Sequence, residues 1–96
     1  PKYFVVNFPD WVHMVALDAK KNIVLVNQYR HATKDHYLEL PGGSTNPGQE
    51  ENPQLAAVRE LEEETGYTSQ KVISLGFHCP NPALMSNKVH CFLALD

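Results

Sequence analysis

Three glutamates near the middle of the chain have the spacing of a divalent-cation site. Glu60, Glu63 and Glu64 lie three and four residues apart, so on an α-helix they share one face, within about 60° of Glu60. Like charges at these spacings destabilise an isolated helix by about 0.2–0.5 kcal/mol per pair. Clustered carboxylates suit Mg²⁺ or Mn²⁺, which take their remaining ligands from water or phosphates. The pattern indicates a metal site; the alternative is a solvated acidic face.

The helix that would carry these glutamates is predicted from its ends. Asn52 is a suitable N-cap, and Pro53 suits the first helical position. Good helix formers run to Glu64, and Gly66 is the expected C-terminal glycine. We therefore expect a helix over 53–64.

The helical wheel also predicts which side of this helix is buried. Ala56 and Ala57 fall on the glutamate face, where small side chains would leave room for a ligand. The larger apolar residues fall on the opposite side, and there we expect the core: Leu55, Val58 and Leu61.

Runs of β-prone residues surround the helix. We expect a short strand at 3–6, a hairpin of 11–17 with 23–26, a strand at 37–40 entering a glycine turn, and strands at 71–79 and 88–95. One helix among several strands indicates an α+β fold with a mixed sheet, not a repeating βαβ pattern.

Composition limits the classes of protein. The 96 residues fit one domain, 1–96, and a hydrophobic fraction of 43% excludes a disordered chain. No apolar run approaches the roughly 20 residues of a membrane span, and a net charge of -3 disfavours nucleic acid as a partner. Cys79 and Cys91 are too few for a disulfide framework, so we expect reduced thiols in a cytoplasmic protein.

The central segment resembles the Nudix box, G-x5-E-x7-R-E-U-x-E-E-x-G-U, in which U is apolar. Every specified position from Glu51 onward matches, through Arg59-Glu60-Leu61 and Glu63-Glu64 to Gly66-Tyr67. Seven residues, not five, separate Gly43 from Glu51. The longer spacing falls in a loop, where insertions are tolerated.

Residues outside the box are similar to the ADP-ribose pyrophosphatase branch of this family. They are Gln28-Tyr29-Arg30, the run from Leu38 to Gly43, and Pro82, which lies 16 residues after Gly66. The resemblance implies a Nudix fold, a mixed sheet in an α/β/α sandwich, of which we expect the C-terminal part to be missing here. It also implies hydrolysis of the pyrophosphate bond of ADP-ribose or a similar nucleotide sugar.

The resemblance further implies the roles of particular residues. Glu60, Glu63, Glu64 and the Gly42 carbonyl would bind Mg²⁺ or Mn²⁺. Either Glu60 or Glu63 would act as the catalytic general base, because no carboxylate side chain occurs from Thr65 to Leu95; the base could also lie beyond residue 96.

Four other residues would support the site. Gly43 would allow the close approach of the backbone, and Glu51 and Arg59 would form an ion pair that holds the loop against the helix. Arg30 would bind a substrate phosphate; the alternative is a surface arginine.

Other interpretations stay open at this level. His78 and His90 flank a proline-rich loop and could contact substrate, although a lone histidine is more often structural. The protein could instead be a house-cleaning nucleoside triphosphate pyrophosphohydrolase or a nucleotide-sensing module without activity. The resemblance also implies a homodimer.

Overall fold

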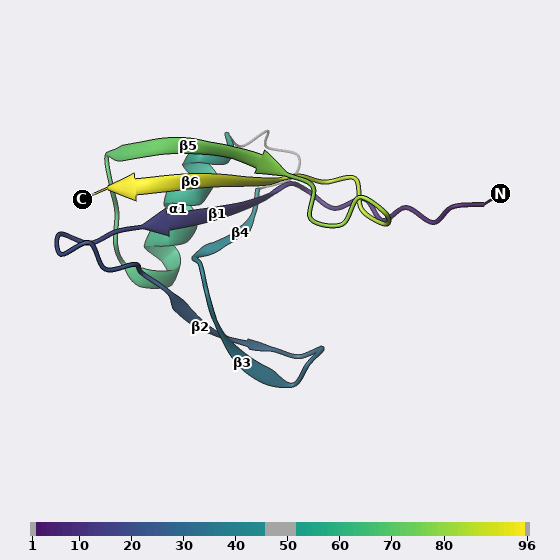
Figure 1. Cartoon of the computed structure of the whole chain (residues 1–96), viewed down its shortest axis with the longest axis horizontal. Coiled ribbons are helices and arrows are strands. Elements are labelled where there is room, and N and C mark those ends of the chain that lie inside the picture. The colour runs from purple at the N-terminus through teal and green to yellow at the C-terminus, as the bar shows by residue number, and fades with distance from the viewer. Residues whose placement is uncertain (1, 46–51, 96) are drawn as a thin grey trace.

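The computed structural model describes residues 2–45 and 52–95, and its centre is a four-stranded mixed sheet (Figure 1). The strands and the helix, in chain order, are β1 (Trp11–Ala16), β2 (Val26–Arg30), β3 (Asp35–Glu39), β4 (Gly42–Ser44), α1 (Pro53–Thr65), β5 (Lys71–His78) and β6 (Val89–Leu95). The sheet order is β4-β1-β6-β5, in which β1 and β6 are parallel and the other neighbours are antiparallel. The predicted α+β fold with a mixed sheet is confirmed.

The core lies between the sheet and α1. Alternate residues of β1, namely Val12, Met14 and Ala16, are buried on the helix side, and Phe92 and Ala94 of β6 join them. This period of two is that of a strand with one face packed and the other open. The face away from the core therefore carries the other residues of β1.

The predicted orientation of the helix is wrong in one respect. Ala56 and Ala57 are fully buried with Leu61, whereas Leu55 is 65% exposed and Val58 packs only partly against the core. Small alanine side chains let the helix backbone lie close to the sheet, so the alanine face becomes the packed face. The glutamates beside these alanines consequently emerge at the margin of the helix–sheet interface.

The ends of α1 follow the prediction. The side chain of Asn52 accepts a hydrogen bond from the Gln54 N–H at 2.8 Å, and Pro53 occupies the first turn. Gly66 adopts φ 80°, and its N–H donates to the Glu62 carbonyl at 2.8 Å. This left-handed cap satisfies a carbonyl that the helix end would otherwise leave unpaired.

Two predictions of local strand pairing are corrected. The segments predicted as a hairpin, 11–17 and 23–26, share an isolated bridge, and the described hairpin is β2–β3, which projects away from the main sheet (Figure 1). The predicted glycine turn is instead β4, a short edge strand paired with β1. Local sequence suggested a nearby partner, whereas β1 pairs with β6 from the far end of the chain.

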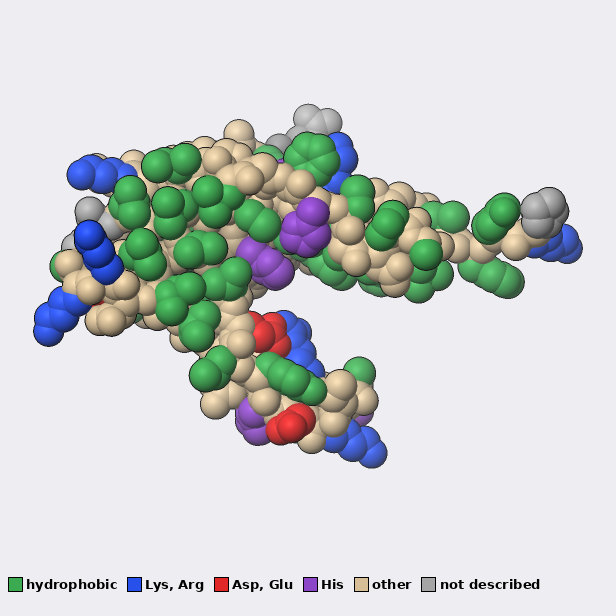
Figure 2. All heavy atoms as spheres, in the orientation of Figure 1, with side chains coloured by type: hydrophobic (Ala, Val, Ile, Leu, Met, Phe, Trp, Pro, Cys, Tyr) green, Lys and Arg blue, Asp and Glu red, His purple; other side chains and the backbone are tan. Residues whose placement is uncertain are grey.

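The sheet face away from α1 is open. Hydrophobic side chains cover much of it (Figure 2), and Ile73 is 51% exposed. Among the described residues α1 is the only helix, so they contain one of the two helical layers of the implied sandwich. No helix within the described ranges has the length and apolar character needed to cross a membrane.

Candidate metal-binding and catalytic site

Glu60 lies directly against the backbone of β4. A Cβ atom on Gly43 would lie 2.6 Å from both the carboxyl carbon and Oε1 of Glu60. Real Cβ atoms do not approach other atoms so closely, so only glycine leaves room for this carboxylate. The predicted supporting role of Gly43 thus has a physical basis in this contact.

Glu64 lies beside Glu60 and accepts a hydrogen bond from the backbone of the other β4 glycine, Gly42. Partial burial raises the pKa of the Glu64 carboxyl and the neighbouring Glu60 raises it further, against hydrogen bonds from the Gly42 backbone and Gln28. The Gln28 amide donates to Oε2 of Glu64 at 3.4 Å. Two adjacent carboxyls, one of them partly desolvated, form an environment that a divalent cation would stabilise.

Glu63 is close in sequence but differently placed. Its side chain is 59% exposed, and Oε2 lies 3.3 Å from Nη1 of Arg59. Within the described residues, no three His, Cys, Asp or Glu side chains converge as a metal-binding group. The structure therefore brings Glu60 and Glu64 together and leaves Glu63 at the rim, where a change of rotamer is unhindered by burial.

Arg59 joins the helix to the end of β4. Nη1 lies 3.1 Å from Oε1 of Glu60, and Nη2 donates to the Ser44 carbonyl at 3.3 Å. A planar guanidinium can make such contacts in several directions at once. The predicted partner Glu51 lies outside the described residues, but the contact with Ser44 ties Arg59 to the end of β4, from which the loop starts.

A cavity of about 500 Å³ lies next to the same glycines, on the open face of the sheet. Its lining residues include Gln28, Arg30, Gly42, His13 and His78. The cavity therefore adjoins the carboxylates through Gly42 and through Gln28, which bonds to Glu64. This position suits the part of a substrate that extends from the reacting group.

Arg30 faces this cavity but is paired with a neighbour. Its Nε donates to Oε2 of Glu39 at 2.7 Å, and Nη2 contacts Oε1, which makes the pair bidentate. The hydrogen bonds raise the pKa of Arg30 and lower that of Glu39. A substrate phosphate would have to replace Glu39 to bind this guanidinium.

The two histidines that flank the proline loop have different surroundings. His78 lines the cavity, whereas Nε2 of His90 lies 2.9 Å from Oδ2 of Asp10. Burial lowers the pKa of a third histidine, His13, and the nearby His78 lowers it further. One of the two predicted candidates, His78, thus lies where it could contact a substrate.

Asp10 binds Thr45, the residue that follows β4, and sequence analysis did not predict this role. Its carbonyl accepts hydrogen bonds from the N–H and hydroxyl of Thr45 at 2.9 and 3.1 Å, and its carboxylate accepts from the Lys88 N–H at 2.9 Å. Burial acts to raise the pKa of Asp10, but the hydrogen bonds from Lys88 and His90 hold it below the usual value. Lys88 and His90 lie 78 and 80 residues from Asp10 in the chain, so these contacts leave no local signal in the sequence.

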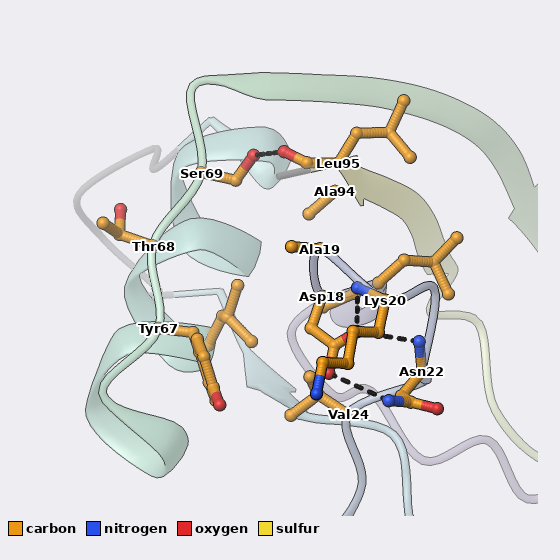
Figure 3. A pocket seen from close by; sticks show the side chains of 13 residues that line it. Asp18, Ala19, Lys20, Asn22, Val24, Tyr67, Thr68, Ser69, Ala94 and Leu95 are labelled. Atoms are coloured by element: carbon orange, nitrogen blue, oxygen red, sulfur yellow. Dashed lines mark hydrogen bonds between the residues drawn. The ribbon is translucent and has the colours of Figure 1, made fainter.

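A second cavity, of about 450 Å³, has no glutamate among its lining residues (Figure 3). It lies between the Asp18–Asn22 turn, the segment after α1 and the end of β6. The Asp18 carboxylate is occupied by the N–H groups of Lys20 and Asn22, and Ser69 donates to the Leu95 carbonyl. These polar groups already satisfy one another, so the cavity lacks the chemistry of the β4 site.

Known proteins resemble this chain in sequence. The model of the NUDIX domain matches residues 8–94. The chain is 36% identical over 90 residues to an ADP-ribose pyrophosphatase of Bacillus subtilis (strain 168), covering 94% of the chain and 48% of that protein. It is 38% identical over 68 residues to an ADP-sugar pyrophosphatase of Mus musculus, covering 71% and 30%.

A solved structure is similar as well. The crystal structure of an ADP compounds hydrolase superposes with a TM-score of 0.82 at 28% identity, covering 91% of this chain and 45% of that one. The chain thus spans about half the length, or less, of these relatives. The residues that match the NUDIX domain, 8–94, include β4, α1 and the two strands that carry His13 and His78.

Proposed function

Because the chain belongs to the Nudix family, we propose that it is a metal-dependent pyrophosphohydrolase acting on ADP-ribose or a similar ADP-sugar. The observation that carries the proposal is the contact of the Glu60 and Glu64 carboxyls with each other and with the backbone at Gly42 and Gly43. Relatives named as ADP-ribose and ADP-sugar pyrophosphatases support the substrate class.

The residues present fit a hard divalent cation, Mg²⁺ or Mn²⁺. Glu60, Glu63, Glu64 and the Gly42 carbonyl are oxygen donors, which these cations prefer. Repulsion between Glu60 and Glu64 would be offset by the positive charge. Such a cation, when bound, neutralises phosphate charge and lowers the pKa of bound water.

The chain itself would position the reactants and move a proton. Glu60 and Glu63 are the candidates for the base that accepts a proton from the attacking water. Glu60 is 16% exposed and fixed by Arg59 and Gly43, whereas Glu63 is 59% exposed and freer to move. Arg30 would bind a phosphate by exchanging its Glu39 partner, and Arg59 would keep the end of β4 at Ser44 in place.

The test is hydrolysis by the full-length protein. We would incubate it with Mg²⁺ or Mn²⁺ and with ADP-ribose, ADP-glucose, dinucleoside polyphosphates or nucleoside triphosphates, and identify the products. AMP and a sugar phosphate, formed only with the cation, are expected. Glu60→Gln should abolish turnover, whereas Glu62→Gln, an exposed neighbour on the same helix, should retain it.

The same panel separates the alternatives. Release of pyrophosphate from nucleoside triphosphates, with no reaction of ADP-sugars, would show a house-cleaning hydrolase. Saturable binding of a nucleotide without products under any cation would show a sensing module. Either result would overturn the proposed activity.

We extend the proposal to assembly and location. Tyr3 and Phe4 are 83% and 86% exposed, and the open sheet face is rich in apolar side chains (Figure 2), which favours a homodimer. Cys79 and Cys91 are free thiols, consistent with a reducing cytoplasm. Light scattering on the full-length protein tests the dimer, and a monomeric mass at micromolar concentration would contradict it.

A further inference from the structure

The cavity beside β4 contains two histidines that the proposed chemistry does not use. His13 of β1 and His78 of β5 both line it, together with Trp11. β1 residues alternate between the packed and the open face, and His13 is on the open one. Figure 2 shows histidine side chains gathered on this open face, next to a hydrophobic surface.

The charged groups of this cavity neutralise each other. Arg30 and Glu39 are the Lys, Arg, Asp or Glu residues among its described lining residues, and they form a bidentate pair. The rest of the described lining offers neutral hydrogen-bonding groups, such as the Gln28 amide, and the indole of Trp11. Away from the Arg30–Glu39 pair, such a wall suits an uncharged polar ring.

The imidazoles are available to a ligand. No hydrogen bond to the His13 ring is made by the described residues, and His78 has only a distant contact of 4.0 Å to the Cys91 sulfur. His90, by contrast, is bonded to Asp10 and does not line the cavity. Among the described residues, neither cavity histidine therefore has a carboxylate partner of the kind that His90 has in Asp10.

We propose that His13 and His78 bind the sugar ring of the substrate, on the side of β4 opposite Glu60. The proposal rests on the proposed function, because that function places a cation at the Gly42 carbonyl, and a cation there would hold the phosphates of the substrate beside this cavity. Imidazole nitrogens can donate to or accept from sugar hydroxyls, and the Trp11 ring offers an apolar surface for the sugar C–H groups. The two histidines would then select for a sugar as the second moiety.

Kinetics with two substrates test this selection. ADP-ribose carries the sugar, whereas the ethyl ester of ADP keeps the same pyrophosphate without it. His13→Phe and His78→Phe, with His13→Ala and His78→Ala as second variants, should each raise KM for ADP-ribose about two- to tenfold. They should leave kcat/KM for the ethyl ester unchanged, as should the matched control His36→Ala on the projecting hairpin for both substrates. Equal losses on both substrates, or no loss on ADP-ribose, would overturn the proposal.

A binding measurement separates this inference from the proposed function. The imidazole ¹⁵N signals of the full-length protein are recorded while ADP-ribose is added without divalent cation. The signals of His13 and His78 should shift and those of His36 should not. Turnover without these shifts would overturn the sugar contact and leave the function intact. Shifts without turnover would keep the contact and overturn the function.

Discussion

Replacement of Gly43 by alanine is a direct test of the carboxylate site. The new Cβ would lie 2.6 Å from the carboxyl carbon of Glu60 and 2.9 Å from Oε2. These atoms are the end of a flexible side chain, so Glu60 can turn away while β4 stays in place. Displacement by about 1 Å is enough to cost roughly 10²-fold in turnover. The free energy of unfolding should change by no more than about 1 kcal/mol, because the interaction that is weakened is a single, partly exposed ion pair between Glu60 and Arg59.

Gly42→Ala is the matched control, because it adds the same methyl group one residue earlier. Its Cβ would lie 2.2 Å from the Val12 carbonyl oxygen and 2.8 Å from Cδ2 of His13. The Val12 oxygen belongs to the backbone of a central strand and cannot turn away. Such overpacking costs about 1–3 kcal/mol, so Tm should fall by at least about 4–8 °C.

The assay combines thermal unfolding with turnover across a Mg²⁺ titration. Gly43→Ala should unfold close to the wild-type temperature but turn over about 10²-fold more slowly, and it should need more Mg²⁺. Gly42→Ala should show mainly a lower Tm. If Gly43→Ala kept wild-type turnover and metal dependence, Glu60 would not work in the position described, and the assignment of the site would fail.

Three further predictions concern the charged residues of α1. Glu63→Gln should lower kcat far more than Tm, because the side chain is 59% exposed; a fall of many degrees with activity kept would contradict its role. Arg59→Lys should raise the Mg²⁺ needed for half-maximal rate, because lysine cannot bond to Ser44 and Glu60 together as the guanidinium does; an unchanged titration would contradict this. Without metal, Tm should fall as pH rises from the ordinary glutamate range through the raised pKa of Glu64, since the folded state holds that proton more tightly than the unfolded state. Glu64→Gln should remove this part of the pH profile, and an identical profile in that variant would refute the reasoning.

Local signals in the sequence were sufficient for the helix and its glutamates. The cap at Asn52, the proline after it and Gly66 all act within a few residues, so they could be read from the chain and are confirmed. The spacing of Glu60 and Glu64 likewise implies proximity once a helix is formed. The metal itself and the catalytic roles remain predictions, since carboxylate spacing shows where a cation fits and not that it binds.

Features that depend on distant partners could not be predicted in this way. β1 pairs with β6, and Asp10 bonds to Lys88 and His90, each across almost the whole chain. The prediction of which face of α1 is buried was wrong for a related reason. Hydrophobic size alone favoured Leu55 as a core residue, but the alanines are the residues that pack against the sheet.

The two glycines of β4 connect the parts of the site because side chains of a strand alternate between its faces. Gly43 faces Glu60 and Gly42 faces His13, so one short edge strand separates the carboxylates from the cavity by little more than backbone. A slip of one residue would exchange the two faces. Two hydrogen bonds at the end of β4 hold its register. Arg59 donates to the Ser44 carbonyl, and the Thr45 N–H donates to the Asp10 carbonyl. Extra residues after Thr45 therefore need not alter which face each glycine presents, which explains how a longer loop is compatible with the same site.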